Sequence, residues 1–262
     1  MTGRRPVTFV RPTLAVVAAC VALLAAGPSM AAGDVEAPKS PGFSFQGPFG
    51  TYDRGELQRG FQVYQEVCSA CHSLKYFAFR NLRSIGFDEV QAKAIAAQYE
   101  VMGGPDEEGE MFERPAVLAD FIPAPFANDN AARAANNGAL PPDLSLIVKA
   151  RAGGEDYVYS LLTGYADPPA DVELGEGMDY NPYYGGGQIA MPPPLFEDGV
   201  EYADGTKASV DQMARDVTTF LTWAAEPDME ARKRMGIKVM VFLVLMTVLL
   251  YMVKRKVWSD VH

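Results

Sequence analysis

Cysteine and histidine are scarce in this chain of 262 residues, which has three of the first and two of the second. Cys20 lies in an apolar N-terminal stretch, and His262 is the last residue, so Cys68, Cys71 and His72 stand alone in the middle. A structural zinc site needs four ligands, and the absence of a second pair excludes it. A thioredoxin-like dithiol is also excluded, because no βαβ pattern surrounds the two cysteines.

The three residues that remain form Cys68-Ser69-Ala70-Cys71-His72. This C-x-x-C-H spacing is typical of covalent haem attachment. Two thiols three positions apart can add to the two vinyl groups of one porphyrin, and the adjacent imidazole then faces the iron. The sequence therefore predicts one covalently bound haem c, held by Cys68 and Cys71, with His72 as an axial ligand.

The second axial ligand has to be something other than histidine. The candidates are the methionines of the central region: Met102, Met111, Met178, Met191, Met213 and Met229. Met191 has the best context, because the glycines at 185–187 allow the backbone to approach a ring and the prolines at 192–194 fix that approach. Met178 is the next candidate, and filling gaps in the core is the alternative for any of them. A haem with histidine and methionine on its two faces has no open position and a raised potential.

Two apolar runs indicate export and anchoring. Residues 1–31 have a basic start, an apolar stretch and a small-residue cleavage site, which is typical of a signal peptide. Residues 235–254 are long enough to cross a bilayer as a helix, and basic residues flank them on both sides. Export followed by one crossing predicts a periplasmic haem c domain at 32–231 and a cytoplasmic tail at 255–262. The predicted location is the bacterial inner membrane, crossed once.

Charge is unevenly distributed along the chain. The predicted outer domain has 32 acidic and 13 basic residues, a net charge of −19. Because phosphates would be repelled, nucleic acid is excluded as a partner. A basic protein partner is favoured, since opposite charges speed encounter. The alternative is that the acidity only maintains solubility.

Hydrophobic periodicity predicts a mainly α-helical outer domain. Leu57, Phe61, Tyr64 and Cys68 recur at helical spacing, so the haem motif closes a helix that begins near Asp53. Further helices are predicted at 209–226, 87–102 and 155–163, whereas no strand pattern persists. Gly60 is expected to allow close approach of the late helix. An early helix carrying the motif and a late helix crossing it form the frame of class I c-type cytochromes, here with long loop insertions and one C-terminal transmembrane helix.

Several blocks beyond the haem motif resemble the cytochrome c1 family in order along nearly the whole mature chain. They are Phe43-Ser44-Phe45 with Gly47, Val67 to Leu74, Gly109 to Phe112, Ala131 to Ser145, Gly154 to Tyr157, Leu161 to Tyr165, Ile189 to Pro192 and Trp223 to Pro227. Many blocks in order are more specific than the five-residue motif, which all c-type cytochromes share.

The resemblance implies roles for individual residues. It assigns Cys68 and Cys71 to the thioether bonds, His72 and Met191 to the axial positions, and Arg133 to a haem propionate. It also implies that Pro141 or Pro142 offers a carbonyl to the His72 ring. Some bacterial relatives carry extra cysteines for a disulfide beside the haem, and this chain has none to spare.

The resemblance implies the function as well. It predicts a subunit of ubiquinol–cytochrome c reductase, in a complex with cytochrome b and a Rieske iron–sulfur protein that is expected to be dimeric. The chain would relay single electrons from the Rieske protein to a soluble or tethered c-type cytochrome, with Glu107, Glu108 and Glu110 as one docking patch. It would have no independent catalytic activity. The alternatives are a free-standing, membrane-tethered shuttle cytochrome and a haem sensor or enzyme with an open sixth site.

Overall fold

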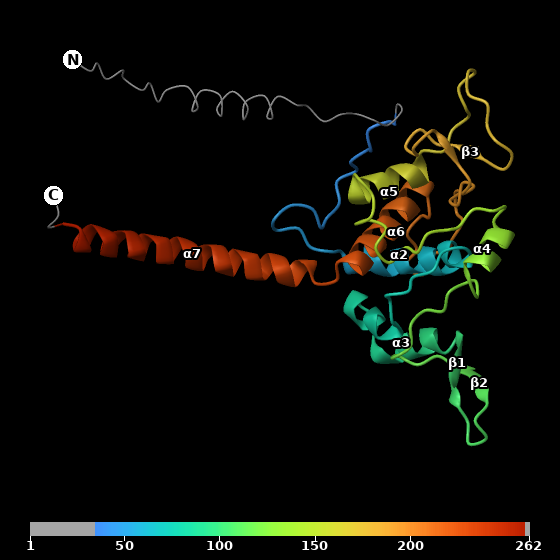
Figure 1. The fold of residues 1–262 in the computed structure, drawn as a ribbon, viewed down its shortest axis with the longest axis horizontal. Helices are drawn as coiled ribbons and strands as arrows, with labels where there is room; N and C mark the ends of the chain where they lie inside the picture. The colour runs from blue at the N-terminus through green and yellow to red at the C-terminus, as the bar shows by residue number, and fades with distance from the viewer. Residues whose placement is uncertain (1–34, 260–262) are drawn as a thin grey trace, which may run out of the picture. The chain divides into compact units, whose positions relative to one another are not determined.

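The computed structural model describes residues 35–259 (Figure 1). The predicted signal peptide and the last three residues lie outside this range. The described part is mainly helical, with two small antiparallel sheets of two strands each. This agrees with the predicted class I cytochrome c frame with loop insertions. We call residues 35–228 the head, because the chain after them continues as one long helix.

The helices and strands follow one another in a loop-rich order. The helices are α2 (Arg54–Glu66), α3 (Glu89–Ala96), α4 (Asp129–Ala135), α5 (Gly154–Thr163), α6 (Val210–Ala225) and α7 (Met229–Val257). Two 3-10 helices are η1 (Cys68–Ala70) and η2 (Phe79–Ile85), and the strands are β1 (Glu100–Pro105), β2 (Met111–Pro115), β3 (Asp179–Tyr180) and β4 (Gln188–Ile189). Strand β1 pairs with β2, and β3 pairs with β4.

Helices α2 and α6 begin where the sequence predicts, and a side chain caps each of them. The Asp53 side chain accepts a hydrogen bond from the Glu56 amide at 3.0 Å, and the Ser209 hydroxyl accepts one from the Gln212 amide at 3.2 Å. These bonds satisfy amides that the first helical turn leaves without partners. The Gln212 side chain does not complete a capping box, because its amide donates to Asp216 at 3.1 Å instead.

Gly60 lies where α2 and α6 pass each other. A Cβ added to this glycine would lie 2.0 Å from the Asp216 carbonyl oxygen and 2.7 Å from the Phe220 Cβ. Any side chain here would therefore push the two helices apart. The prediction of a close helix–helix approach at Gly60 is confirmed.

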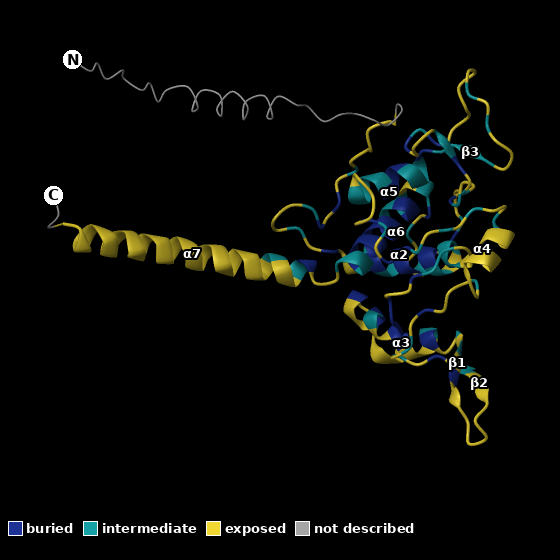
Figure 2. Cartoon of the chain, viewed as in Figure 1, coloured by how far each residue is buried: buried dark blue, intermediate teal, exposed yellow. Residues whose placement is uncertain are grey.

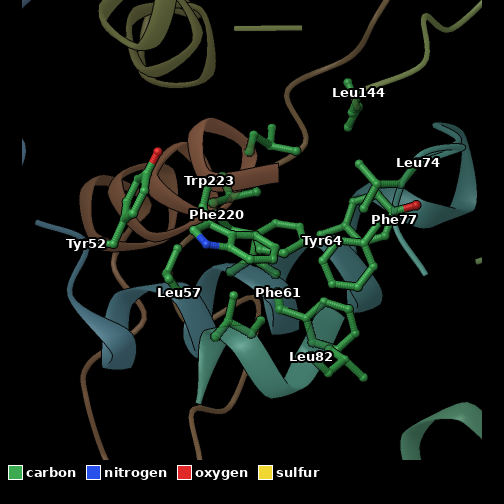
Figure 3. Packing of buried hydrophobic residues seen from close by; sticks show 14 of the residues in the cluster. Tyr52, Leu57, Phe61, Tyr64, Leu74, Phe77, Leu82, Leu144, Phe220 and Trp223 are labelled. Atoms are coloured by element: carbon green, nitrogen blue, oxygen red, sulfur yellow. The ribbon is translucent and has the colours of Figure 1, made fainter. Parts of the chain in front are cut away.

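The core of the head is an aromatic cluster between α2, α6 and the segment after the haem motif (Figure 3). The Phe61 ring packs on Phe77 at 5.9 Å and on Phe220 at 5.6 Å, measured between ring centroids. Trp223 adds an edge contact to Phe77 at 5.9 Å. Offset and edge-to-face pairs of this kind add to the stabilisation from burial. The cluster joins the early and late helices into one unit.

Two local features differ from the expectations. The helix predicted over 87–102 spans only Glu89–Ala96, and residues from Glu100 onward form strand β1. Val101 and Met102 pair with Arg114 and Glu113 of β2, so strand pairing wins over a weak helical pattern. The short helix α4 was not predicted.

Helix α7 begins at Met229, earlier than the predicted span of 235–254, and ends at Val257. It is the one helix in the described part that is long and apolar enough to cross a membrane. Every residue from Arg234 to Ser259 is exposed, as the yellow helix in Figure 2 shows. An apolar surface of this size is unfavourable in water, which supports the predicted lipid contact.

Candidate functional site

A cavity of about 460 Å³ lies beside the haem-type motif. Its size is within the range of ligand-binding pockets in proteins. The wall comes from five parts of the chain: the motif turn with Val67 before it, the loop at 136–151, helix α5, the segment 184–194 and helix α6. The residues that line it are Val67, Cys68, His72, Asn136, Ala139, Leu140, Pro141, Pro142, Leu144, Ile147, Arg151, Tyr157, Val158, Leu161, Leu162, Tyr184, Ile189, Ala190, Met191, Pro192, Pro194, Val217 and Leu221. Most of this wall is apolar.

The motif forms a tight turn directly after α2. The backbone amides of Cys71 and His72 both donate to the Cys68 carbonyl, at 3.2 and 2.9 Å. The Ser69 hydroxyl donates back to the Gln65 carbonyl of α2 at 2.8 Å. These bonds hold the motif as a 3-10 turn on the end of a helix whose other residues are in the core. The position of the motif is therefore set by the α2–α6 packing.

The two cysteines form no disulfide with each other and differ in exposure. Cys68 is half-buried and lines the cavity, whereas Cys71 is exposed. Burial raises the pKa of the Cys68 thiol to about 12, with a smaller contribution from Cys71. Cys68 is therefore a neutral thiol at pH 7, with weak nucleophilicity until a partner approaches.

His72 is held in one orientation. Its Nδ1 lies 2.8 Å from the Pro142 carbonyl oxygen, so Nδ1 carries the proton and donates this hydrogen bond. The lone pair of Nε2 is then free for a ligand. Burial lowers the pKa of His72, against the opposing effects of the Pro142 carbonyl and Asp143. The imidazole is neutral at pH 7, which is the form that binds a metal.

Asp143 holds the loop that carries Pro142 against the chain just after His72. Its carboxylate accepts hydrogen bonds from the Ser73 hydroxyl at 2.7 Å and from the Lys75 amide at 2.9 Å. Ser145 donates its amide to the other carboxylate oxygen at 3.0 Å. Although burial acts to raise it, these donors hold the pKa of Asp143 below its usual value. The loop that carries Pro142 is thereby tied to the chain just after His72.

Met191 is the only methionine among the described residues that line the cavity. Its backbone carbonyl accepts a hydrogen bond from the Tyr165 hydroxyl at 2.9 Å. Met178 packs beside Gly175 and does not reach the cavity wall. The structure thus brings one of the two best candidates to the site and leaves the other outside it.

The structure does not bring Arg133 to the cavity. This residue is exposed on α4, and its guanidinium donates to the Gly138 carbonyl at 3.1 Å. The arginine on the cavity wall is Arg151, next to Tyr157 of α5. Arg151 was not predicted, although it lies just before the Gly154–Tyr157 block. Its proximity to that block was the one available signal.

The donors on the wall determine what can bind there. No group of three or more His, Cys, Asp or Glu side chains in residues 35–259 is placed to hold a bare metal ion. One imidazole, one thioether and an apolar wall suit a metal whose other ligands come from a flat macrocycle. Cys68 at the rim adds a sulfur that can bond to the edge of such a ring. The residues present therefore fit a haem.

The predicted docking patch lies on the β1–β2 hairpin. Glu107, Glu108 and Glu110 are exposed in its connecting loop. The Asp106 side chain shapes this loop by accepting from the amides of Glu108 and Glu110, at 3.0 and 2.8 Å. The hairpin is ordered at its tip and presents several negative charges to solvent.

The model of the cytochrome C1 family matches residues 43–261. The chain is 49% identical over 263 residues to cytochrome c1 of Rhodospirillum rubrum, which covers 92% of this chain and 97% of that protein. It is 53% identical over 225 residues to the mitochondrial cytochrome b-c1 complex catalytic subunit of Candida albicans, covering 86% and 78%.

A third relative has a different length. Cytochrome b/c1 of Bradyrhizobium diazoefficiens is 47% identical to this chain over 279 residues. The match covers 95% of this chain and 40% of that protein.

Proposed function

Because the chain belongs to the cytochrome c1 family, we propose that it is the membrane-anchored electron relay of a ubiquinol–cytochrome c reductase. It works in a membrane complex with cytochrome b and passes single electrons from a Rieske iron–sulfur protein to a c-type cytochrome. Oxidoreductase activity belongs to the complex, and the complex is dimeric. The observation that carries the proposal is one cavity whose wall contains Cys68, His72 and Met191.

The residues of the site have separate tasks. Cys68 and Cys71 would hold the haem through thioether bonds, His72 would bind the iron through Nε2, and Met191 would bind it through its sulfur. When bound, the haem would supply a one-electron centre. The Pro142 carbonyl keeps the His72 proton on Nδ1, and the Tyr165 hydroxyl holds the Met191 backbone in place. The apolar wall excludes water, which favours the less charged state of the site.

Topology follows from the order of the segments. Residues 1–31 direct export, residues 32–231 form the periplasmic haem domain, and α7 crosses the bacterial inner membrane through residues 235–254. The tail at 255–262 is cytoplasmic. The acidic surface of the head attracts a basic c-type cytochrome, and Glu107, Glu108 and Glu110 contribute to this docking.

The first test concerns axial ligation. In Met191→Leu we expect covalent haem to remain while the reduction potential falls by well over 59 mV, the change that corresponds to a factor of ten for a one-electron couple. Redox titration of the purified protein measures this potential, and electron flow from quinol in membranes should stall. Met178→Leu is the matched control, because this side chain does not line the cavity. An unchanged potential in Met191→Leu would reject the thioether assignment.

The second test concerns the propionates of the haem. We propose that Arg151 binds one of them, in the role that the resemblance implied for Arg133. Loss of a positive charge near the iron favours the oxidised state, so Arg151→Gln should lower the potential by roughly 30–60 mV. Arg133→Gln serves as the comparison and should leave the potential within error. The opposite pattern would return the role to Arg133.

Membership of a complex is tested separately. Membranes solubilised in mild detergent are separated by blue-native electrophoresis and stained for haem. We expect the stain at the mass of a multi-subunit complex that also contains cytochrome b. Haem that migrates alone at the mass of one chain would support a free-standing shuttle cytochrome instead.

A further inference from the structure

The first turn of α7 packs against the head and forms hydrogen bonds with it. Met229 is buried in the core cluster at 5% exposure. The Glu230 carboxylate accepts from the Tyr52 amide at 2.9 Å and from the Arg54 guanidinium at 2.9 Å. Lys233 donates from Nζ to two backbone carbonyls of the N-terminal segment. The start of the helix therefore has fixed contacts on more than one side.

The two carbonyls that Lys233 binds belong to Phe45 and Gly50, at 2.6 and 3.1 Å. They lie at the two ends of a short turn, residues 46–49, which we call the anchor loop. In Figure 1 the blue N-terminal segment comes next to the start of α7. Because one ammonium group binds both ends of the loop, the loop cannot move along the helix without breaking these bonds.

The anchor loop is also ordered from within. Phe43 and Phe45 are buried before it and stack on each other at 5.1 Å. The Gln46 side chain accepts from the Phe43 amide at 3.2 Å, and the Thr51 amide donates to the Ser44 carbonyl at 3.2 Å. The loop is thus closed at its base.

Phe49 is the exception in this segment, since 79% of its surface is exposed. A single exposed apolar side chain is ordinary on a protein surface. What distinguishes Phe49 is its place, beside the Gly50 carbonyl that Lys233 binds. An ordered loop presents this ring outward at the level of the base of the apolar helix.

The position of the anchor loop along α7 can be compared with the layers of a bilayer. Ile237, the first residue of an apolar run whose one charge is Lys238, is four residues after Lys233, or about 6 Å along the helix axis. The headgroup layer on each side of the hydrocarbon is about 5–8 Å thick. The loop therefore lies at headgroup depth when α7 spans the membrane. Aromatic rings are the side chains that favour this layer.

The charges around the base of α7 suit the same environment. Arg232 and Arg234 are exposed at the start of the helix, and Lys238 follows one turn later. Arg232 is paired with Glu226, whereas Arg234 and Lys238 form no ion pair with an acidic side chain among residues 35–259. Cations at this depth attract anionic lipid headgroups.

We propose that the anchor loop is a second membrane contact of the head, in which Phe49 enters the lipid headgroup layer beside α7. The single helix sets how far the head stands from the bilayer, and the loop stops it from tilting or turning about the helix axis. Lys233 is the positioning residue that keeps the loop at this height. The inference rests on the proposed membrane anchoring by α7 but not on the ligands of the haem.

Depth can be measured with a nitroxide on Phe49→Cys in the full-length holoprotein. The protein is placed in nanodiscs of phosphatidylcholine and phosphatidylglycerol, and collisions with oxygen and with a water-soluble nickel chelate are compared. At position 49 we expect nickel collisions to be reduced several-fold relative to Phe196→Cys, whose parent side chain is 65% exposed on the head. Equal nickel access at both positions would overturn the proposal.

A second measurement separates lipid from protein as the occupant. The same label is examined in the isolated subunit in nanodiscs and in the complete membrane complex. Protection in both preparations supports a lipid contact. Protection only in the complete complex would mean that a neighbouring subunit covers Phe49, which overturns the lipid assignment.

The role of Lys233 is tested by Lys233→Met in the Phe49→Cys background. We expect the label to become more mobile and its nickel access to rise several-fold, while haem content and reduction potential stay unchanged. An unchanged label would remove Lys233 from the positioning role. A Leu245→Cys label in the middle of α7 keeps the two proposals apart, since nickel access there would show that the helix itself is not in the membrane.

Discussion

Helix α6 contributes both to the α2–α6 crossing and to the cavity wall, but its two faces are packed differently. On one face of α6, Met213 and Phe220 are fully buried against the crossing. Val217 and Leu221, from the neighbouring face, line the cavity instead. The protein thus completes the first surface with its own side chains and leaves the second for a ligand.

The crossing is stabilised by contacts that need no cofactor. Gly60 allows the backbones to touch, and the Arg59 guanidinium binds both oxygens of Asp216 at 2.9 and 3.0 Å. Asp216 has no exposed surface, and burial raises its pKa even though Arg59 and Gln212 oppose this. A buried pair of this kind contributes little net stability but strongly disfavours other alignments of the two helices.

The cavity wall is built mainly from loops. Its two central segments, at 136–142 and 184–194, contain the Asn-Asn-Gly and Gly-Gly-Gly turns and five prolines that restrict the backbone. Loops have fewer backbone partners than helices and are opened more easily. The difference teaches that the helices position the site, while the bound haem is expected to complete the packing of the loops around it.

The largest expected effect comes from Gly60→Ala. Its new Cβ would overlap the Asp216 carbonyl oxygen, which is backbone and cannot rotate away. We expect a loss of roughly 3 kcal/mol or more in the free energy of unfolding, at the upper end of overpacking effects. Denaturant unfolding of the holoprotein, followed by tryptophan fluorescence, measures it.

Gly55→Ala is the matched control in the same helix. The nearest atom to its new Cβ is the capping Asp53 Oδ1 at 3.1 Å, a contact that a shift of a few tenths of an ångström relieves. Alanine is the better helix former, so this change should be neutral or stabilise by up to about 1 kcal/mol. Equal losses in both variants would show that helix propensity, not the crossing, is being measured.

An effect of intermediate size is expected when the haem is removed. The loops of the cavity wall should lose more stability than the α2–α6 crossing. In Cys68→Ser with Cys71→Ser, we expect amide exchange in the 136–142 and 184–194 loops to rise by orders of magnitude, because the cavity loses its filling. Exchange in α2 and α6 should rise much less. Hydrogen exchange read by mass spectrometry reports both at once. A uniform rise would mean that the crossing also depends on the haem.

The smallest expected effect is the change with pH in the stability that Asp204 contributes beside the α2–α6 crossing. The Thr206 amide, followed by Arg59, lowers the pKa of Asp204 to about 2. The folded state therefore binds this proton less tightly than the unfolded state, for which the pKa is about 4. The stabilising contribution is complete above pH 4 and is lost as the pH falls towards 2.

Asp204→Asn should flatten this part of the acid-unfolding curve and change little at pH 7, because the side chain is about half exposed. Glu173→Gln, an exposed acid elsewhere on the head, controls for the loss of one negative charge. If both variants flatten the curve equally, net charge and not the Arg59 contact is responsible.

Local sequence predicted the parts of the fold that depend on local physics. The starts of α2 and α6 followed from Asp53 and Ser209, whose side chains can satisfy free amides within three residues. Strand β1 could not be predicted in this way, because the residues of β2 with which it pairs lie outside the segment 87–102. Pairing with β2 gives strand geometry to residues that have only a weak helical pattern.

Some residues of the candidate site could also be predicted from local sequence, and others could not. Cys68, Cys71 and His72 are contiguous, so their spacing alone predicts how they act together. Met191 was preferred over Met178 from its glycine and proline neighbours, whereas the place of Arg151 instead of Arg133 at the wall depends on which loops reach the cavity. Those loops are more than 60 residues away from the motif along the chain, and no local pattern encodes their final path.

By itself, the sequence determined the long apolar helix and the two helices that cross, since each is encoded by neighbours within a few turns, and it predicted haem attachment and Met191. Only the tertiary structure decided that Arg151 lines the cavity and that Lys233 ties a loop to the base of α7. These outcomes depend on packing between distant segments. Such packing is selected by the total free energy of the folded head and not by any one stretch of residues.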